Sequence, residues 1–218
     1  MMQAANEPNY FEQLADPRAI ILPEEANHAL DLLHHQVKGC ILCTELAATR
    51  TNTVFGVGNR RPELMIIGEA PGADEDAKGE PFVGRAGQLL NNILLASGMR
   101  REDVYIANIL KCRPPNNRRP EPLESQNCLP YLKNQLRVLR PKFLCLLGAT
   151  AAQNLLQTDA SIGQLRGKIH QFEGIPTICT FHPAYLLRNP SAKIQTWEDM
   201  QSLLTAMGRP IPKTQNAH

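Results

Sequence analysis

The stretch from residue 64 to residue 87 constrains the fold of this chain more than any other. Residues 64–67 are a short apolar run typical of a buried parallel strand. A turn with two glycines and a proline follows, and from Arg85 the apolar residues recur at helical spacing. A strand, a glycine-rich turn and a helix form the ligand site at the carboxyl edge of many α/β sheets, although an ordinary βα connection has the same pattern.

Two side chains in this stretch favour a ligand site. Glu69 stands next to the turn, and Phe82 lies in the loop before the helix. A carboxylate and an aromatic ring are suited to binding a flat polar ligand.

Three more segments, residues 104–110, 143–147 and 177–181, read as strands, and helical patterns separate them. The sequence therefore predicts an α/β fold with a central four-stranded parallel sheet and helices on both faces. Polar or glycine residues follow each strand, namely Glu69, Asn108, Gly148 and His182. Because parallel strands end at one edge of a sheet, we expect these groups to lie together.

The 218 residues, 43% of them hydrophobic, suffice for one full-sized core with disordered ends. We expect a disordered tail over residues 1–22, one domain over residues 23–207 and a second disordered tail over residues 208–218. A net charge of +2 does not by itself indicate a nucleic-acid-binding protein. No apolar run reaches the length of a membrane span, and the amino terminus lacks a signal-like segment. These features predict a cytoplasmic protein, which we expect to be a monomer.

Four of the six cysteines have the positions of metal ligands. They are Cys40, Cys43, Cys112 and Cys128. Four thiolates can hold either Zn²⁺ or a four-iron cluster, and the spacing does not decide between them. Cys145 and Cys179 lie in apolar strands, where free cysteine is a common small hydrophobe. The Cys-x-x-Cys at residues 40–43 argues against six ordinary buried thiols, and its place after a helix disfavours a redox-active motif.

Several motifs occur together in one order. They are Gly68-Glu69-Ala70-Pro71-Gly72, Pro81-Phe82-Val83-Gly84, Asn108 followed by Lys111-Cys112-Arg113-Pro114-Pro115, Leu165-Arg166-Gly167-Lys168, and His182-Pro183-Ala184-Tyr185-Leu186-Leu187-Arg188-Asn189-Pro190. With these motifs and its four cysteines, the chain resembles the family 4, iron–sulfur uracil-DNA glycosylases over about residues 37–207. The resemblance implies a three-layer α/β/α fold and a [4Fe-4S] cluster on the four cysteines. It also implies removal of uracil from DNA.

The resemblance also implies a uracil-binding site with two catalytic residues, Glu69 and His182. Its uracil-binding residues would be Gly68, Glu69, Ala70, Phe82, Asn108 and His182. Phe82 would stack on the flipped base, and Asn108 would pair with uracil O4 and N3–H. His182 would stabilise the negative charge at uracil O2. Glu69 would position or activate water, or act mainly through its backbone.

Basic and apolar residues outside the pocket are expected to contact DNA. They are Arg113, Arg118, Arg166, Lys168, Leu186, Leu187 and Arg188, with Lys111 and Arg119 as further phosphate contacts. Leu186 and Leu187 would form a wedge that fills the space left by the flipped base. Asp74, Glu75 and Asp76 read as a solvated acidic face.

Three alternatives stay open at this point. A non-catalytic nucleic-acid-binding module with a structural zinc explains the cysteines and the basic loops, but gives no role to Asn108 and His182. An iron–sulfur electron carrier would need a cofactor site, and the chain has no dinucleotide fingerprint. A uracil-DNA crosslinking relative would carry a histidine-bearing insertion after Cys112, which is missing, and His170 lies too late to replace it. Hydrolytic turnover is therefore favoured.

Overall fold

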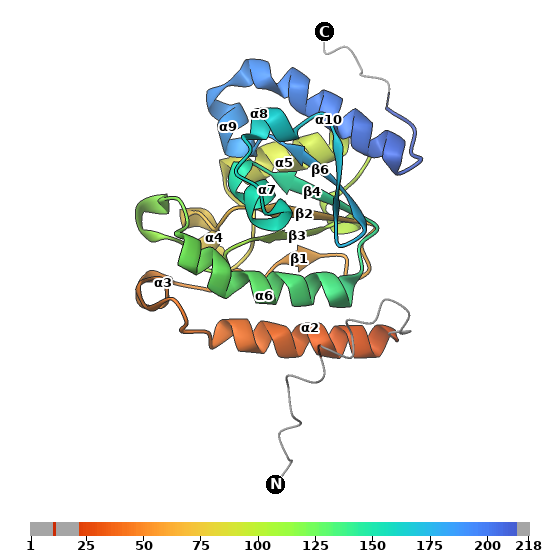
Figure 1. Cartoon of the computed structure of the whole chain (residues 1–218). Helices are drawn as coiled ribbons and strands as arrows, with labels where there is room; N and C mark the ends of the chain where they lie inside the picture. The colour runs from red at the N-terminus through yellow and green to blue at the C-terminus, as the bar shows by residue number, and fades with distance from the viewer. Residues whose placement is uncertain (1–10, 12–21, 213–218) are drawn as a thin grey trace.

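The structure, a computed structural model, describes residue 11 and residues 22–212 (Figure 1). Its strands are β1 (Val57–Gly58), β2 (Leu64–Gly68), β3 (Tyr105–Asn108), β4 (Phe143–Leu147), β5 (Ile169–Phe172) and β6 (Ile175–Thr180). Its helices are α2 (Pro23–Lys38), α3 (Thr44–Thr49), α4 (Ala73–Lys78), α5 (Arg85–Ala96), α6 (Pro122–Leu139), α7 (Ala149–Leu156), α8 (Ile162–Leu165), α9 (Pro183–Arg188) and α10 (Lys193–Ala206), with one-turn segments η1 (Arg101–Asp103), η2 (Pro115–Asn117) and η3 (Pro190–Ala192). Within these residues, no helix combines the length and the hydropathy that a membrane crossing requires.

The sheet has six strands in the order β1-β3-β2-β4-β6-β5. Its four central strands are parallel neighbours, as predicted. The prediction of four strands in all is wrong, because β1 pairs antiparallel with β3 and β5 antiparallel with β6 at the two edges. β1 spans only 2 residues, too few for a sequence pattern. A two-residue turn joins β5 to β6, and the positive φ angles of Glu173 (47°) and Gly174 (82°) suit a hairpin.

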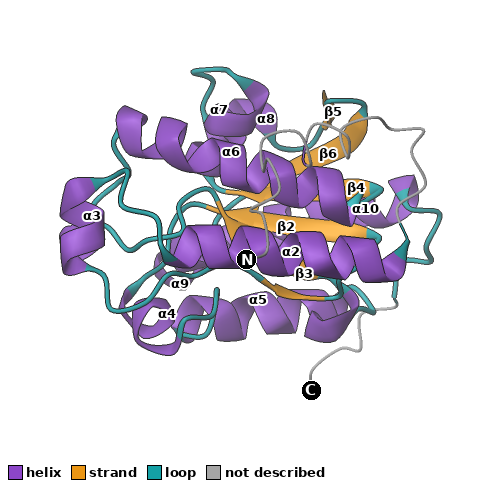
Figure 2. Cartoon of the chain, turned by 90° about the horizontal axis from the view of Figure 1, so that it is seen from below, coloured by secondary structure: helices purple, strands orange, loops and turns teal. Residues whose placement is uncertain are grey.

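Helices cover both faces of the sheet, which confirms the predicted α/β class. α6 and α2 lie below the sheet in Figure 1, and α5 and α10 lie above it; Figure 2 shows the α2 side. The core is divided accordingly, with leucines of α2 and α6 packing on one face and leucines of α5 and α10 on the other. Most of the predicted amino-terminal tail lies outside the described residues. Phe11, however, is buried in the same cluster as the leucines of α2.

The carboxyl ends of the four parallel strands lie at one edge of the sheet. Gly68 at the end of β2 is the register partner of Asn108 at the end of β3. Gly148 follows β4 and His182 follows β6. These two strands are parallel neighbours, and their last residues are register partners. The predicted co-location of these groups is therefore confirmed.

Candidate active site

A pocket of about 430 Å³ opens at this edge of the sheet, a size that suits a small ligand. The residues singled out from the sequence that line it are Glu69, Ala70, Phe82, Asn108, Arg118, His182 and Arg188. Sequence reasoning missed Glu75, Asn117 and Tyr185, which line the pocket as well. Tyr185 lies in the motif that begins at His182, but its position in the sequence does not indicate a role. Its ring stacks on that of Phe181, with 5.0 Å between the ring centroids.

Gly68 leaves room for two side chains that line the pocket. A Cβ atom at this position would lie 2.4 Å from Oδ1 of Asn108 and 2.6 Å from Cζ of Phe82. Both distances are too short for any side chain, so only glycine lets the amide and the ring meet at the pocket floor. Gly68 was predicted to bind uracil and is not among the residues that line the pocket. Its lack of a side chain lets two predicted base-binding groups lie close together.

The side chain of Asn108 is held ready for a ligand. The residue is buried, and among the described residues its Oδ1 atom has no hydrogen-bond partner. A buried acceptor without a partner costs about 1–3 kcal/mol, so such an atom in a pocket indicates a donor that arrives with the ligand.

The Phe82 ring lines the pocket, and contacts with Arg101 hold its backbone in a strained conformation. Its φ angle is 53°, a left-handed conformation that costs about 1–3 kcal/mol for a bulky residue. Arg101 donates to the carbonyl oxygens of Pro81 and Phe82, the second at 3.1 Å. A Cβ at Gly87 would lie 1.8 Å from the Phe82 carbonyl oxygen, so glycine is also required there. The loop is thus fixed before any ligand binds.

Glu75 holds the same loop from the other side. Its carboxylate accepts hydrogen bonds from the backbone N–H groups of Val83 (2.9 Å), Gly84 (3.0 Å) and Gly72 (3.1 Å). The buried Asp76 carboxylate likewise accepts from the backbone of residues 51 and 52. The prediction of a solvated acidic face is therefore wrong for both residues. Sequence alone cannot show which carboxylates of an acidic run point back to the chain.

His182 lines the pocket beside Phe82 and is neutral. Its ring centroid lies 5.5 Å from that of Phe82, and its Nδ1 atom accepts a hydrogen bond from the Ala184 backbone at 3.2 Å. The ring proton therefore sits on Nε2, which is free to donate to a ligand. Burial, helped by the nearby charge of Arg188, lowers the pKa of His182 to about 4. A Cβ at Gly148 would lie 3.1 Å from the His182 Cβ, so a small residue there gives the histidine its room.

Comparison with known proteins identifies the family. The uracil DNA glycosylase superfamily profile matches residues 55–201. This chain belongs to that superfamily. It is 43% identical to the type-4 uracil-DNA glycosylase of Archaeoglobus fulgidus over 192 residues, covering 84% of this chain and 96% of the relative. It is 45% identical to the type-4 enzyme of Thermotoga maritima over 168 residues (76% and 87%), and 42% identical to that of Pyrobaculum aerophilum over 179 residues (78% and 91%).

The segment predicted to contact DNA follows His182 and forms helix α9. Leu187 is 38% exposed, but Leu186 is fully buried at 0%. The prediction of a two-leucine wedge is therefore wrong for Leu186, which points to the core side of α9. Only Leu187 and the exposed Arg188 remain available to a DNA strand.

The basic residues differ in how free they are. Lys111 is 1% exposed and cannot reach a phosphate, so its predicted DNA contact is wrong. Burial lowers the pKa of Lys111 to about 7. The neighbouring Cys128 and Cys112 oppose this effect in part. Arg118 pairs with Glu124 (2.7 Å) and Glu45 (2.6 Å).

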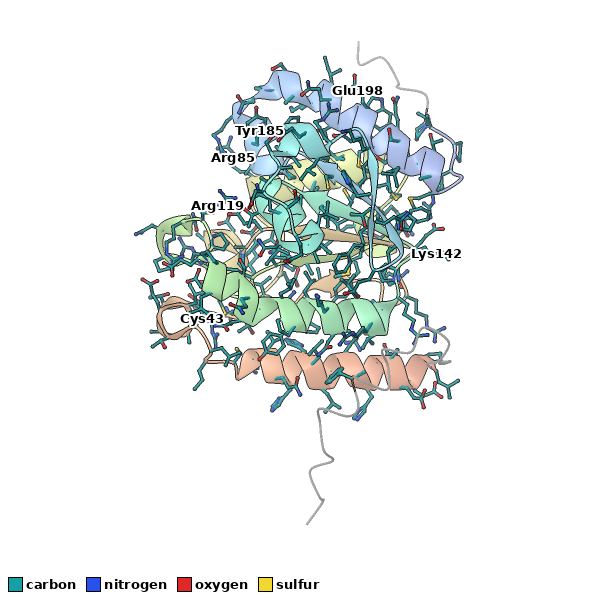
Figure 3. The ribbon with its side chains drawn as sticks, in the orientation of Figure 1. Cys43, Arg85, Arg119, Lys142, Tyr185 and Glu198 are labelled. Atoms are coloured by element: carbon teal, nitrogen blue, oxygen red, sulfur yellow. The ribbon has the colours of Figure 1, made fainter. Side chains whose placement is uncertain are left out.

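Arg166 is also paired with carboxylates, whereas Lys168 is exposed. Arg166 pairs with the buried Asp199 at 3.1 Å and with Glu198 at 3.2 Å. Arg119, Arg85 and Tyr185 lie along one side of the molecule in Figure 3, far from Lys142. The predicted DNA contacts of Arg113, Lys168 and Arg188 stay predictions. For Arg118 and Arg166, a DNA contact requires each guanidinium to bind a phosphate in addition to its carboxylate partners.

The four candidate metal ligands lie near enough to interact electrostatically. Burial raises the pKa of the Cys112 and Cys128 thiols. Neighbouring cysteines raise it further, since Cys40 and Cys43 act on Cys112, and Cys112 and Cys43 act on Cys128. Arg50 donates to Cys112 Sγ at 3.0 Å. Among the described residues no group of three or more histidine, cysteine or acidic side chains is placed to hold a metal ion.

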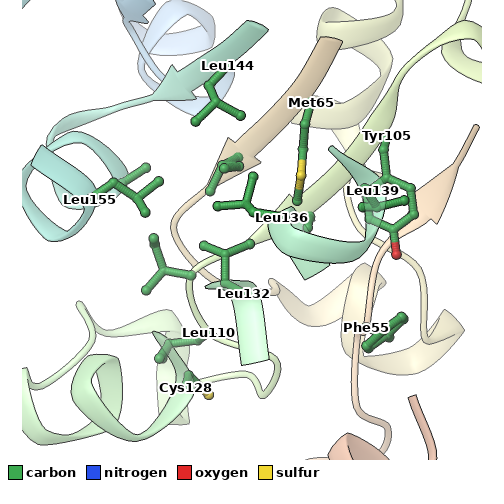
Figure 4. Packing of buried hydrophobic residues seen from close by; sticks show 14 of the residues in the cluster. Phe55, Met65, Tyr105, Leu110, Cys128, Leu132, Leu136, Leu139, Leu144 and Leu155 are labelled. Carbon is green, nitrogen blue, oxygen red and sulfur yellow. The ribbon is translucent and has the colours of Figure 1, made fainter. Parts of the chain in front are cut away.

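Cys145 and Cys179 lie apart from this group, in β4 and β6, and both are buried at 1% exposure or less. Cys128 lies beside Leu110 at the end of the packed leucines in Figure 4.

Proposed function

We infer that this protein is a uracil-DNA glycosylase, which hydrolyses the bond between N1 of uracil and C1′ of deoxyribose and leaves an abasic site in DNA. The observation that carries the proposal is the buried Oδ1 of Asn108, which has no partner among the described residues, in a residue that lines the same pocket as Phe82 and His182. The N3–H of uracil is the donor that this acceptor needs. The relatives that carry the name type-4 uracil-DNA glycosylase support the proposal.

The pocket residues divide the reaction between them. The target base leaves the stack at a cost of a few kcal/mol, and Phe82 recovers part of it by stacking on the flipped ring. Asn108 accepts from N3–H and donates its amide to O4. The neutral His182 donates its Nε2–H to O2, where negative charge develops as the glycosidic bond breaks. Glu69 positions the water that adds to C1′, with its carboxylate as the proposed general base.

We propose that Cys40, Cys43, Cys112 and Cys128 are the ligands of a [4Fe-4S] cluster. Burial raises the pKa of the free thiols of Cys112 and Cys128, and ligation to iron would hold them as thiolates. The guanidinium of Arg50 at Cys112 fits the negative charge of such a site. We propose a structural role, in which Cys112 and Cys128 fix the loop that follows Asn108. The expected monomeric state, the cytoplasmic location and the carboxyl-terminal tail stay predictions.

The proposal is tested by incubating the purified protein with an oligonucleotide that contains one uracil. Alkali should then cleave the strand at the position of the uracil, while matched oligonucleotides with cytosine or thymine stay intact. Binding of the uracil strand without any abasic site would instead favour a non-catalytic binding module. A covalent protein–DNA product would favour the crosslinking alternative.

Asn108→Asp should change the choice of base. The carboxylate repels uracil O4 and can accept from the N4 amino group of cytosine, a favoured pairing. One such pairing is worth about 1–3 kcal/mol, so the ratio of uracil to cytosine excision should fall by about 10- to 100-fold. The ratio is measured with matched oligonucleotides opposite the same base. Asn92→Asp, an exposed position on α5, is the control and should leave the ratio unchanged. Parental selectivity in Asn108→Asp would mean that another group reads the base.

Leu187→Ala should weaken the reaction on duplex DNA more than on single strands. The exposed Leu187 side chain can fill the gap that a flipped base leaves in a duplex, and a single strand has no such gap. Rates on both substrates give the comparison, with Leu95→Ala at the exposed surface of α5 as the control. Equal losses on the two substrates would contradict the wedge.

A further inference from the structure

The buried Lys111 has no role in the mechanism above, although it lies between the pocket and the cysteines. It is among the largest fully buried side chains, and its ammonium makes two hydrogen bonds. One goes to the backbone oxygen of Asn108 at 2.9 Å, and the other to Oε1 of Gln135 at 2.7 Å. No carboxylate among the described residues is close enough to pair with it. A buried polar group is costly unless it is hydrogen-bonded, so these two acceptors fix the position of the Lys111 amino group.

Gln135 fixes the far end of this arrangement to two other parts of the fold. Its amide donates to the Phe55 backbone oxygen at 2.9 Å and to the Tyr105 hydroxyl at 3.3 Å. Gln135 itself lies on α6, the helix that also carries Cys128. The ammonium is therefore held in a buried network whose polar groups satisfy one another.

At the other end of the network, hydrogen bonds fix the backbone at the end of β3. After Asn108, the N–H groups of Ile109 and Leu110 donate to the backbone oxygens of Gly68 and Glu69, both at 3.0 Å. The Lys111 ammonium then turns back to the Asn108 carbonyl, three residues earlier. The backbone on either side of the Asn108 side chain is thus fixed, while its buried Oδ1 has no hydrogen-bond partner among the described residues.

We propose that Lys111 is a positioning residue, whose ammonium, anchored by Gln135, holds the Asn108 backbone so that the Asn108 amide meets uracil in the correct orientation. This inference rests on the proposed uracil excision. It makes Lys111 and Asn108 one unit: without the ammonium the amide is misplaced, and without the amide the ammonium has nothing left to position. A small displacement of a group at the reacting base can cost up to about 10²-fold in rate.

A double-mutant cycle tests the proposal. Lys111→Met should lower single-turnover uracil excision by about 10- to 100-fold in the parent protein. In the Asn108→Ala background the same change should cost less than about threefold, because residues that act through one another are not additive. Binding of free uracil, measured by calorimetry, should weaken in Lys111→Met without any DNA or chemical step. Lys142→Met, an exposed lysine on the opposite side of the molecule, is the matched control and should change neither quantity.

The outcomes separate this role from a purely structural one. Equal losses in the two backgrounds, or parental uracil binding in Lys111→Met, would overturn the proposal. If Lys111→Met loses iron or fails to fold, Gln135→Met decides instead: it keeps the ammonium, and its loss of rate must again require Asn108. A parent protein that releases no uracil overturns the proposed function itself, whereas an active parent with additive losses overturns only the role of Lys111.

Discussion

His182→Ala should lower the rate of uracil excision by about 10²- to 10³-fold, the usual cost of removing one donor from developing negative charge. The Nε2–H of His182 is free to donate because Nδ1 already accepts from the Ala184 backbone. His182→Gln, which keeps an N–H donor, should recover part of the loss. His28→Ala, at an exposed position on α2, is the control and should leave the rate unchanged. A full rate in His182→Ala would remove this residue from the mechanism.

The charge state of His182 adds a dependence on pH. Its pKa of about 4 in the folded protein lies below the value of about 6.5 for a free histidine. Between these two values the unfolded chain binds more protons, so this residue reduces stability as the pH falls from about 6.5 towards 4. Above that window it makes no such contribution. A nuclear magnetic resonance titration should show His182 still neutral at pH 5, whereas a midpoint near 6.5 would contradict the burial argument.

The sequence predicts the centre of this fold well because buried parallel strands are continuous apolar runs. Residues 64–67 and 143–147 carry that signal without interruption, and both lie in the centre of the sheet. The two edge strands were not predicted, since β1 is too short for any period and β5 depends on its hairpin partner. Pattern reasoning detects burial more readily than pairing, so edges are the first elements it misses.

The pocket was predicted for a related reason. Glu69 and His182 follow strands and Asn108 ends one, and the geometry of a parallel sheet brings such positions together. Residues whose roles depend on side-chain direction were not predicted correctly. Leu186 and Leu187 are neighbours of the same type, but one faces the core and the other the solvent.

The direction of charged side chains is equally hidden in the sequence. Lys111 was grouped with surface lysines because lysine is rarely buried, and only the fold reveals the two acceptors that allow it. Glu75 was assigned to solvent although it fixes the loop of Phe82. Both residues bind backbone groups that a turn of the chain brings back to them, and the sequence pattern does not show such turns.

Cys128→Ala should remove the metal, whereas Cys145→Ala should not. Both side chains are buried, so the two variants lose the same atoms from a closed environment. Only the Cys128 thiol lies within the electrostatic influence of Cys112 and Cys43. The parent protein should contain iron and absorb near ~400 nm, and Cys128→Ala should lose most of both. Cys145→Ala should keep its iron and lose only the packing of one sulfur atom, about 1 kcal/mol.

The same pair of variants measures how much the metal stabilises the fold. Binding of a structural metal is coupled to folding, so a protein that loses it also loses that free energy. A change of 1 kcal/mol shifts Tm by about 2–4 °C in a domain of this size, and Cys128→Ala should therefore melt at least about 5 °C below Cys145→Ala. Metal analysis and thermal melts on the same samples link the two effects. Loss of iron from Cys145→Ala, or full iron in Cys128→Ala, would overturn the ligand assignment, and zinc in the parent would replace the cluster with a single-ion site.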